Sequence, residues 1–86
     1  MRSLKEILGI NLKYYRNLEG LSQSDYYFKY HLSAKHMANV ELGKVNVTLD
    51  FVDKVAKKLN ISSLELLTYD KEKVVSKKRV DQKVTN

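Results

Sequence analysis

The chain has 86 residues, of which 43% are hydrophobic and 30% are charged, a balance typical of one folded domain with a modest core. It has three glycines, no proline and no cysteine, which excludes disulfides and thiolate metal sites and favours helices over an all-β fold. The formal net charge of +6 suits a polyanionic partner such as nucleic acid, although charge alone does not identify one.

The first predicted helix begins after Ser3 and ends at Gly20. Ser3 and Glu6 have the spacing of a capping box, in which the hydroxyl and the carboxylate each satisfy a free backbone amide. A glycine at position 20 suits the left-handed backbone that often ends a helix. Between these limits, apolar side chains recur at helical spacing and predict one buried face. They are Leu4, Ile7, Leu8, Leu12, Tyr15 and Leu18.

Two short helices are predicted next, joined by a turn of a few residues. Ser22 and Asp25 form a second capping box, which opens a helix that runs to about Tyr30. Ser33 caps the following helix, which is expected to end near Gly43. A helix of about two turns is long enough to lie in the major groove of DNA, which is about 12 Å wide. The pair therefore has the proportions of a helix-turn-helix.

This pair of helices has an apolar inner side and a polar outer side. The residues expected to pack together on the inner side are Tyr26, Tyr30, Leu32, Met37 and Val40. The outer face of the second helix then carries Ala34, Lys35, Ala38 and Asn39.

Two further helices complete the predicted domain. Thr48 is placed to cap a fourth helix, and Ser62 with Glu65 forms a third capping box that opens a short fifth one. The apolar residues of these two helices are Leu49, Val52, Val55, Ala56 and Leu59, then Leu64, Leu66 and Leu67. Short connections favour a compact all-α bundle of five helices over residues 1–69.

The helical pattern stops at Asp70, and no cap is recognised beyond it. Residues 70–86 are charged, with scattered valines and a basic run at 77–79. We predict that this segment is a basic tail, either mobile or ordered only against a partner. A basic run of this kind is more often a solvated segment than an arm in the minor groove.

The order and spacing of residues across 4–69 resemble the Cro/phage-repressor type helix-turn-helix family, also called the xenobiotic response element family. The segments that carry the resemblance are 12–16, 20–23, 32–33, 41–44, 56–61 and 66–67, together with Leu49. The resemblance implies a lambda-repressor-like domain of five helices. It also implies a homodimer that binds palindromic operators in double-stranded DNA as a transcriptional regulator, most often a repressor.

The resemblance also assigns roles by position. Gln23 matches a glutamine that contacts a phosphate and braces the recognition helix, and Arg16 with Glu41 matches a structural ion pair. Side-chain chemistry agrees with base reading, because lysine suits guanine, asparagine bonds adenine and alanine touches the thymine methyl group. His36 is placed to reach a phosphate. The complete predicted DNA-binding set is Gln23, Ser33, Ala34, Lys35, His36, Ala38, Asn39, Lys44 and Asn46.

Three positions depart from the family pattern. Tyr27 stands where a small residue is usual, so the third helix would have to shift or the ring would have to tilt outward. His31 replaces a glycine at a turn position that favours a left-handed backbone, which histidine tolerates at some cost. Val47 replaces a frequent proline. These changes bear on the angle of the recognition helix more than on the fold.

Other interpretations of the same residues stay open. Lys35 and Asn39 can be ordinary solvated helix residues, and the tyrosines are more typical of a core than of a stacking platform for bases. The chain can instead be an antitoxin that binds its toxin through residues 70–86, or an interaction module that has lost DNA binding. Phage or mobile-element repression also fits. Residues 46–49 are similar to a run found in controllers of restriction–modification systems.

The sequence contains no motif for catalysis. No carboxylate pair or phosphate-binding loop is recognised, and His31 and His36 lack companions at metal-ligand spacing. We therefore predict a protein that is not an enzyme and that uses no cofactor and no metal.

Partner and location follow from the remaining features. The predicted dimer surface is the last helix, with Leu64, Leu67 and Tyr69, extended by Val74 and Val75. Residues 1–6 lack the apolar run of a signal peptide, and no stretch has the length of a membrane span. We expect a cytoplasmic protein with no membrane partner, and a protein partner would bind through the tail.

Overall fold

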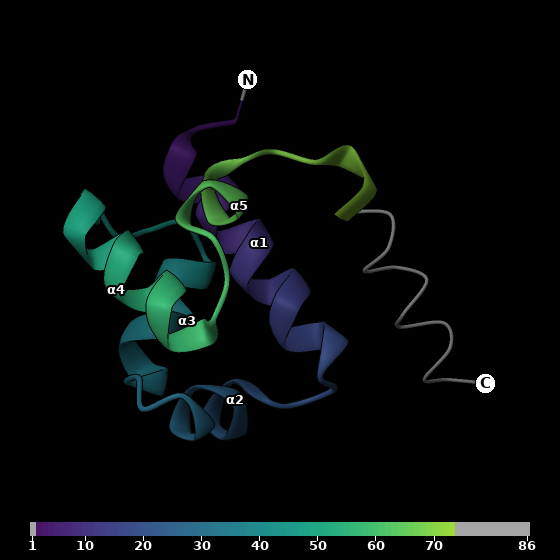
Figure 1. Cartoon of the computed structure of the whole chain (residues 1–86), viewed down its shortest axis with the longest axis vertical. Coiled ribbons are helices and arrows are strands. Elements are labelled where there is room, and N and C mark those ends of the chain that lie inside the picture. Colours follow the sequence, from purple (N-terminus) through teal and green to yellow (C-terminus); the bar gives the residue numbers. More distant parts are fainter. Residues whose placement is uncertain (1, 74–86) are drawn as a thin grey trace.

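The computed structural model describes residues 2–73, and it is all-α over this part of the chain (Figure 1). Five helices follow one another in the order that the sequence predicts. They are α1 (Leu4–Leu18), α2 (Gln23–Lys29), α3 (Ala34–Glu41), α4 (Leu49–Leu59) and α5 (Ser63–Leu67). The predicted fold class is confirmed.

Four of the helices begin at the predicted caps. The backbone amide of Ser3 donates to the Glu6 carboxylate at 2.9 Å while the amide of Glu6 donates to the Ser3 hydroxyl at 3.3 Å, which completes a capping box. The side chains of Ser22, Ser33 and Thr48 each accept a hydrogen bond from the backbone amide three residues further along the chain. These bonds satisfy amides that the helix itself leaves free, so the helix starts are fixed locally.

The predicted capping box at Ser62 is wrong. Ser62 precedes α5, but its side chain makes no capping hydrogen bond. The Glu65 carboxylate lies instead 3.1 Å from the Tyr15 hydroxyl and 3.4 Å from Nζ of Lys73. The carboxylate therefore joins α5 to α1 and to the segment after α5, because these partners from other parts of the chain compete with the local amide.

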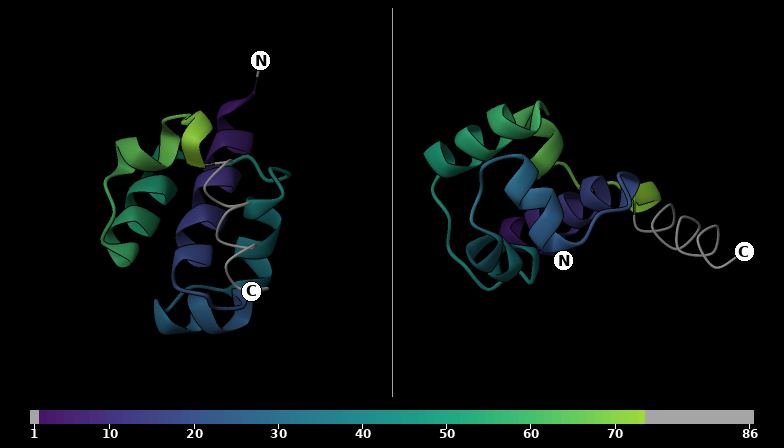
Figure 2. Two further views of the ribbon diagram at one scale, coloured as in Figure 1. Left: turned by 90° about the vertical axis from the view of Figure 1, so that its right-hand side faces the viewer. Right: turned by 90° about the horizontal axis from the view of Figure 1, so that it is seen from below.

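The core forms where α1 meets the other helices. α1 packs against both α3 and α5, α2 packs against α3, and α4 packs against α5. The two further views show α1 running through the middle of the bundle, with α2 across the end away from the N-terminus (Figure 2). The fully buried core side chains are Leu8, Leu12, Tyr26, Tyr27, Met37, Val40, Val55 and Leu66.

One glycine permits an unusually close approach between helices. A Cβ atom on Gly9 of α1 would lie 2.4 Å from the backbone carbonyl oxygen of Glu41, the last residue of α3. Only glycine, which has no Cβ atom, allows the two backbones to come this close. The end of α3 therefore rests directly on the backbone of α1.

The first residues after α5 are more ordered than the sequence indicates. Contrary to the expectation that no cap is present, the Asp70 side chain accepts a hydrogen bond from the amide of Glu72 at 2.8 Å, and residues 71–73 are helical. Lys73 is 7% exposed, and its Nζ donates to the carbonyl of Glu65 at 3.2 Å. Val74, Val75 and the basic run at 77–79 lie outside the described residues. The division between domain and tail stays a prediction.

None of the helices in the described part of the chain is long and apolar enough to cross a membrane.

Candidate nucleic-acid interface

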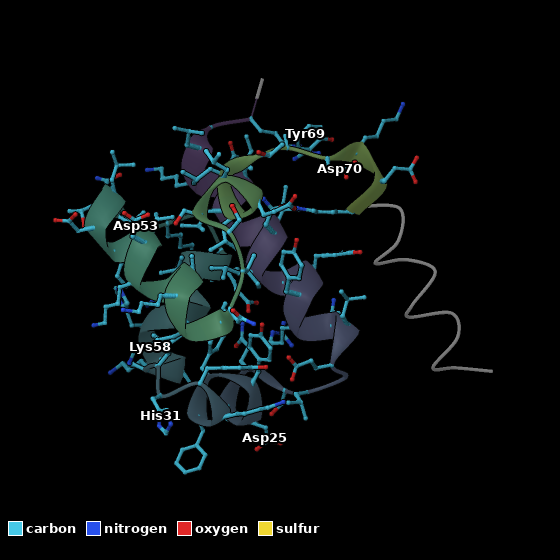
Figure 3. The ribbon with its side chains drawn as sticks, viewed as in Figure 1. Asp25, His31, Asp53, Lys58, Tyr69 and Asp70 are labelled. Carbon is cyan, nitrogen blue, oxygen red and sulfur yellow. The ribbon has the colours of Figure 1, made fainter. Side chains whose placement is uncertain are left out.

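The turn between α2 and α3 is tight and is held from two sides. His31 has a φ of 60°, which confirms the predicted left-handed backbone at this position. The amide of Leu32 donates to the carbonyl of Tyr27 at 2.8 Å and closes the turn. Nζ of Lys58, at the end of α4, donates to the carbonyl of His31 at 2.8 Å, and the two residues lie side by side in Figure 3.

The inner side of the two helices is packed as predicted. Tyr26, Met37 and Val40 are buried, and Tyr30 and Leu32 are partly buried against the same core. The Tyr26 ring meets the Tyr30 ring edge-on, with centroids 5.0 Å apart. Burial of Met37 and Val40 fixes which side of α3 faces the protein and which side faces outward.

Two of the four side chains predicted on the outer face of α3 are exposed. Lys35 and Asn39 are exposed and lie one helical turn apart, so they share a face. Ala38 is half-buried, and Ala34 packs partly against the core. Ala34 and Ala38 are therefore only partly exposed, and their place among the base-reading residues stays a prediction.

Two polar residues border the first turn of α3. The Ser33 hydroxyl accepts a hydrogen bond from the amide of His36 at 3.2 Å, so its own proton is free to be donated elsewhere. The His36 side chain is exposed, and its ring stands edge-on to Phe51 of α4 at 5.3 Å. The aromatic contact holds the imidazole beside α4.

The loop after α3 contains two of the predicted DNA-binding residues. Lys44 and Asn46 are both exposed in this loop. The amide oxygen of Asn46 accepts a hydrogen bond from Nζ of Lys5 at 3.1 Å. Lys5 is a basic neighbour that the sequence did not indicate, because it lies 41 residues away along the chain.

The end of α3 is anchored by one buried carboxylate. Arg16 donates to both oxygens of Glu41, from Nε at 2.9 Å and from Nη2 at 3.0 Å, which confirms the predicted ion pair. Nε2 of Gln23 donates to the Glu41 carboxylate at 3.0 Å, so Gln23 braces α3 as the resemblance implies. The Tyr27 hydroxyl donates to the same carboxylate at 2.5 Å. The phosphate contact of Gln23 stays a prediction.

Burial and hydrogen bonding act on the pKa of Glu41 in opposite directions. Removal from water raises it, but the hydrogen bonds from Arg16, Tyr27 and Gln23 outweigh this effect and leave the pKa below its ordinary value. The hydrogen bond to Glu41 in turn raises the pKa of Arg16. The pair is therefore charged and mutually neutralised at neutral pH.

The Tyr27 ring does not tilt outward, so that predicted alternative is wrong. The side chain is 0% exposed and meets the Tyr26 ring edge-on at 5.1 Å. Its burial and its bond to Glu41 raise the pKa of the phenol, which keeps the hydroxyl protonated and able to donate. The core tolerates the buried phenol because its hydroxyl donates a hydrogen bond to the Glu41 carboxylate.

The charge around α3 favours a polyanion. Glu41 is the one acidic residue between positions 33 and 46, and Arg16 neutralises it. Lys35 and Lys44 are exposed along the same stretch. A phosphate backbone approaching α3 would meet cations and neutral polar groups without an opposing carboxylate on that helix. Among the described residues, no group of three or more acidic or histidine side chains is placed to hold a metal ion.

The short α2, the tight turn at His31 and the outward flank of α3 define a helix-turn-helix protein. A family model described as helix-turn-helix matches residues 12–66, and the chain belongs to this Cro/C1-type family. Membership makes it a DNA-binding transcription regulator.

Two known proteins are similar to it. The control protein C.SmaI of Serratia marcescens is 40% identical over 65 residues, which cover 76% of this chain and 77% of that protein. The crystal structure of the hypothetical transcription factor NHTF from Neisseria is 25% identical, with a TM-score of 0.70, and the match covers 84% of this chain and 83% of that one.

Proposed function

We propose that the protein is a homodimeric repressor that places α3 of each copy in the major groove of one half of a palindromic operator. The observation that carries the proposal is the exposed flank formed by Lys35 and Asn39 on a helix whose opposite side is packed and whose end is anchored. A helix that is packed on one side and anchored at its end presents its free side chains at a fixed angle, as direct base reading requires.

The interface divides into residues that read bases and residues that position the protein. Lys35 and Asn39 reach base edges, and the methyl groups of Ala34 and Ala38 pack closest to the bases from the helix itself. The residues that bind phosphates and set the register are Gln23, Ser33, His36, Lys44 and Asn46. Because positioning contacts carry no sequence information, the two groups are separable by mutation.

The proposed dimer forms through α5. Leu64 of α5 is 76% exposed and Tyr69, just after the helix, is 44% exposed, so this end of the domain presents apolar surface to water. A pocket of about 290 Å³ is lined by Leu67 of α5 together with Leu4 and Leu49. Two copies joined here would place their recognition helices about one DNA turn apart, roughly 34–36 Å.

The biological role that we favour is the controller of a restriction–modification system, acting in the cytoplasm without catalysis. Residues 46–49 suggest this role, and the similarity to a protein named as a control protein supports it. An antitoxin or an interaction module would have a protein as its main partner. Removal of residues 70–86 would abolish the protein complex of an antitoxin while sparing operator binding, and the selection experiment distinguishes an interaction module from an operator-binding protein.

Selection of bound sequences from a random duplex pool tests the proposal. We expect enrichment of one palindrome, with an affinity that falls steeply as salt rises, because each phosphate contact releases a counterion. An interaction module would enrich no sequence and would show little salt dependence, and that outcome would overturn the proposal. An enriched site without two-fold symmetry would contradict the dimer alone.

A further inference from the structure

The Glu41 carboxylate has all of its acceptor capacity filled. An ionised carboxylate offers about four acceptor sites on its two oxygens. Oε1 accepts from Nη2 of Arg16 and from Gln23, and Oε2 accepts from Nε of Arg16 and from Tyr27. The Glu41 side chain is only 3% exposed, so water has little access to replace a missing donor.

The four hydrogen bonds come from two different helices. Arg16 belongs to α1, whereas Gln23 and Tyr27 lie one turn apart on the same face of α2. Glu41 is the last residue of α3, and Gly9 allows its backbone to rest on α1. Of the two donors from α2, Tyr27 is fully buried and Gln23 is partly exposed.

We propose that Tyr27 is a positioning residue of the DNA-reading site: its hydroxyl orients the Glu41 carboxylate, and through it the Gln23 amide and the angle of α3 against α2. The inference rests on the proposed function, in which α3 reads bases and Gln23 contacts a phosphate. It concerns a feature of this chain, because the family pattern has a small residue at position 27.

The position of the Tyr27 ring allows the hydroxyl to act in this way. The ring stands at 78° to the Tyr26 ring, which leaves it little freedom to swing. Without the hydroxyl, one acceptor site on Oε2 would be empty in a buried place. The carboxylate would then turn toward its remaining donors and would alter the direction of Gln23, whose Nε2 lies 3.0 Å away.

Tyr27→Phe tests the proposal, with Tyr26→Phe as the matched control. Tyr26 is a neighbouring buried tyrosine of the same helix whose hydroxyl is not one of the donors to Glu41. Both substitutions keep the ring, and circular dichroism establishes that each chain is folded before binding is measured. The probes are the palindrome selected by the wild-type protein and a scrambled duplex of equal length.

We expect Tyr27→Phe to lower the affinity for the palindrome about tenfold, as loss of a hydrogen bond to a charged group predicts. The affinity for the scrambled duplex should fall much less, because only the phosphate contact of Gln23 is weakened there. Tyr26→Phe should preserve the ratio of the two affinities. A loss of stability alone would leave that ratio intact at temperatures where the protein is folded, so an unchanged ratio in Tyr27→Phe would overturn the proposal.

A second measurement separates this inference from the proposed function. Amide and side-chain NMR shifts should change at Gln23 and along α3 in Tyr27→Phe without DNA, and much less so in Tyr26→Phe. If the wild-type protein selects no duplex, the proposed function fails, and the shifts alone decide whether the hydroxyl positions α3. Shifts confined to the immediate neighbours of the substituted ring would count against it.

Discussion

At the scale of single residues, the chemistry of the interface depends on one charge that is kept out of water. A carboxylate removed from solvent loses its hydrogen bonds to water, and donors in the protein must replace them. Glu41 does so with four hydrogen bonds, two of them from a guanidinium that matches its planar geometry. Because the same residue ends the helix that is proposed to read bases, we expect stability and recognition to be coupled at this residue.

The pH dependence of stability should show this coupling. The pKa of Glu41 is lowered from 4.5, so its charged form stabilises the fold fully above that pH and loses its contribution as the pH falls through the lower folded-state value. Glu41→Gln should cost about 3 kcal/mol near neutral pH, because Arg16 is left buried without its partner. The difference between the two proteins should shrink in acid. Urea unfolding between about pH 7 and about pH 3 measures it.

Other acidic groups with lowered pKa values do not affect the difference in stability between the two proteins. Hydrogen bonds also lower the pKa of Glu6, through Ser3, and of Glu19, through Lys29 and Tyr30. Both residues are present in the wild-type and in the Glu41→Gln chain, so their effects cancel in the difference. A difference that stays constant over the whole pH range would show that ionisation of Glu41 does not stabilise the fold.

Base reading and phosphate binding should separate at Asn39 and Lys44. Asn39→Ala should relax base choice at one position in each half-site and cost about 1–3 kcal/mol of binding. Lys44→Ala should weaken binding to every sequence by a similar factor and reduce the salt slope by about one. Repeating the selection with each variant measures both effects. Unchanged base preference in Asn39→Ala would remove this residue from the reading set.

At the scale of helices, Gly9 should be essential despite its poor helix propensity. In the interior of a helix, alanine is normally more favourable than glycine by about 1 kcal/mol. Here the added Cβ would lie 2.4 Å from the Glu41 carbonyl oxygen, a backbone atom that cannot move alone. We therefore expect Gly9→Ala to destabilise the fold by about 1–3 kcal/mol, as overpacking does. Chemical unfolding measures the change.

The control for Gly9→Ala is Lys54→Ala, at an exposed position of α4. It should stay within about 0.5 kcal/mol of the wild-type protein. If Gly9→Ala were as stable as this control, α1 and α3 would have to separate freely, and the close contact would not anchor the recognition helix.

Helix starts were predictable from the sequence because capping is local. Ser3 and Thr48 bond amides three residues away, and no distant partner competes for their side chains. Ser62 breaks this rule because Glu65 finds partners on α1 and after α5. A capping box can be identified from spacing only where the acidic residue has no better partner elsewhere.

The parts of the site that were not predictable depend on contacts between distant residues. The family pattern pointed to Arg16 and Glu41, but burial of Tyr27 depends on an acceptor 14 residues further along the chain. Lys5 approaches Asn46 across 41 residues, and no spacing rule connects them. The charge of Lys73 assigned it to the tail. Its long side chain instead packs on the domain, with Nζ 5.2 Å from the centre of the Tyr15 ring.

At the scale of the whole molecule, the surface proposed to face DNA and the surface proposed for the dimer are separated by α1. This helix packs against α3 and also against α5. A second copy bound to α5 would therefore leave the outward flank of α3 free, as simultaneous binding of DNA and partner requires (Figure 2). Burial of Leu64 in a dimer would also remove the most exposed apolar side chain of α5 from water.

Leu64→Glu should separate dimer formation from folding. Leu64 is 76% exposed, so its replacement should change the stability of the monomer by no more than about 0.5 kcal/mol. A charge buried in a symmetric interface would face its own copy, and the dimer should dissociate at about tens of micromolar. Light scattering measures the mass, and the affinity for the palindrome should fall sharply because its two half-sites are no longer bound by linked helices.

Phe28→Glu is the matched control, because Phe28 is 83% exposed on α2, far along the chain from α5. It introduces the same charge at an apolar surface position and should leave the mass of the dimer unchanged. If Leu64→Glu stayed dimeric while Phe28→Glu became monomeric, the copies would meet through α2. Such a dimer would cover surface next to the turn at His31, and the proposed dimer through α5 would be overturned.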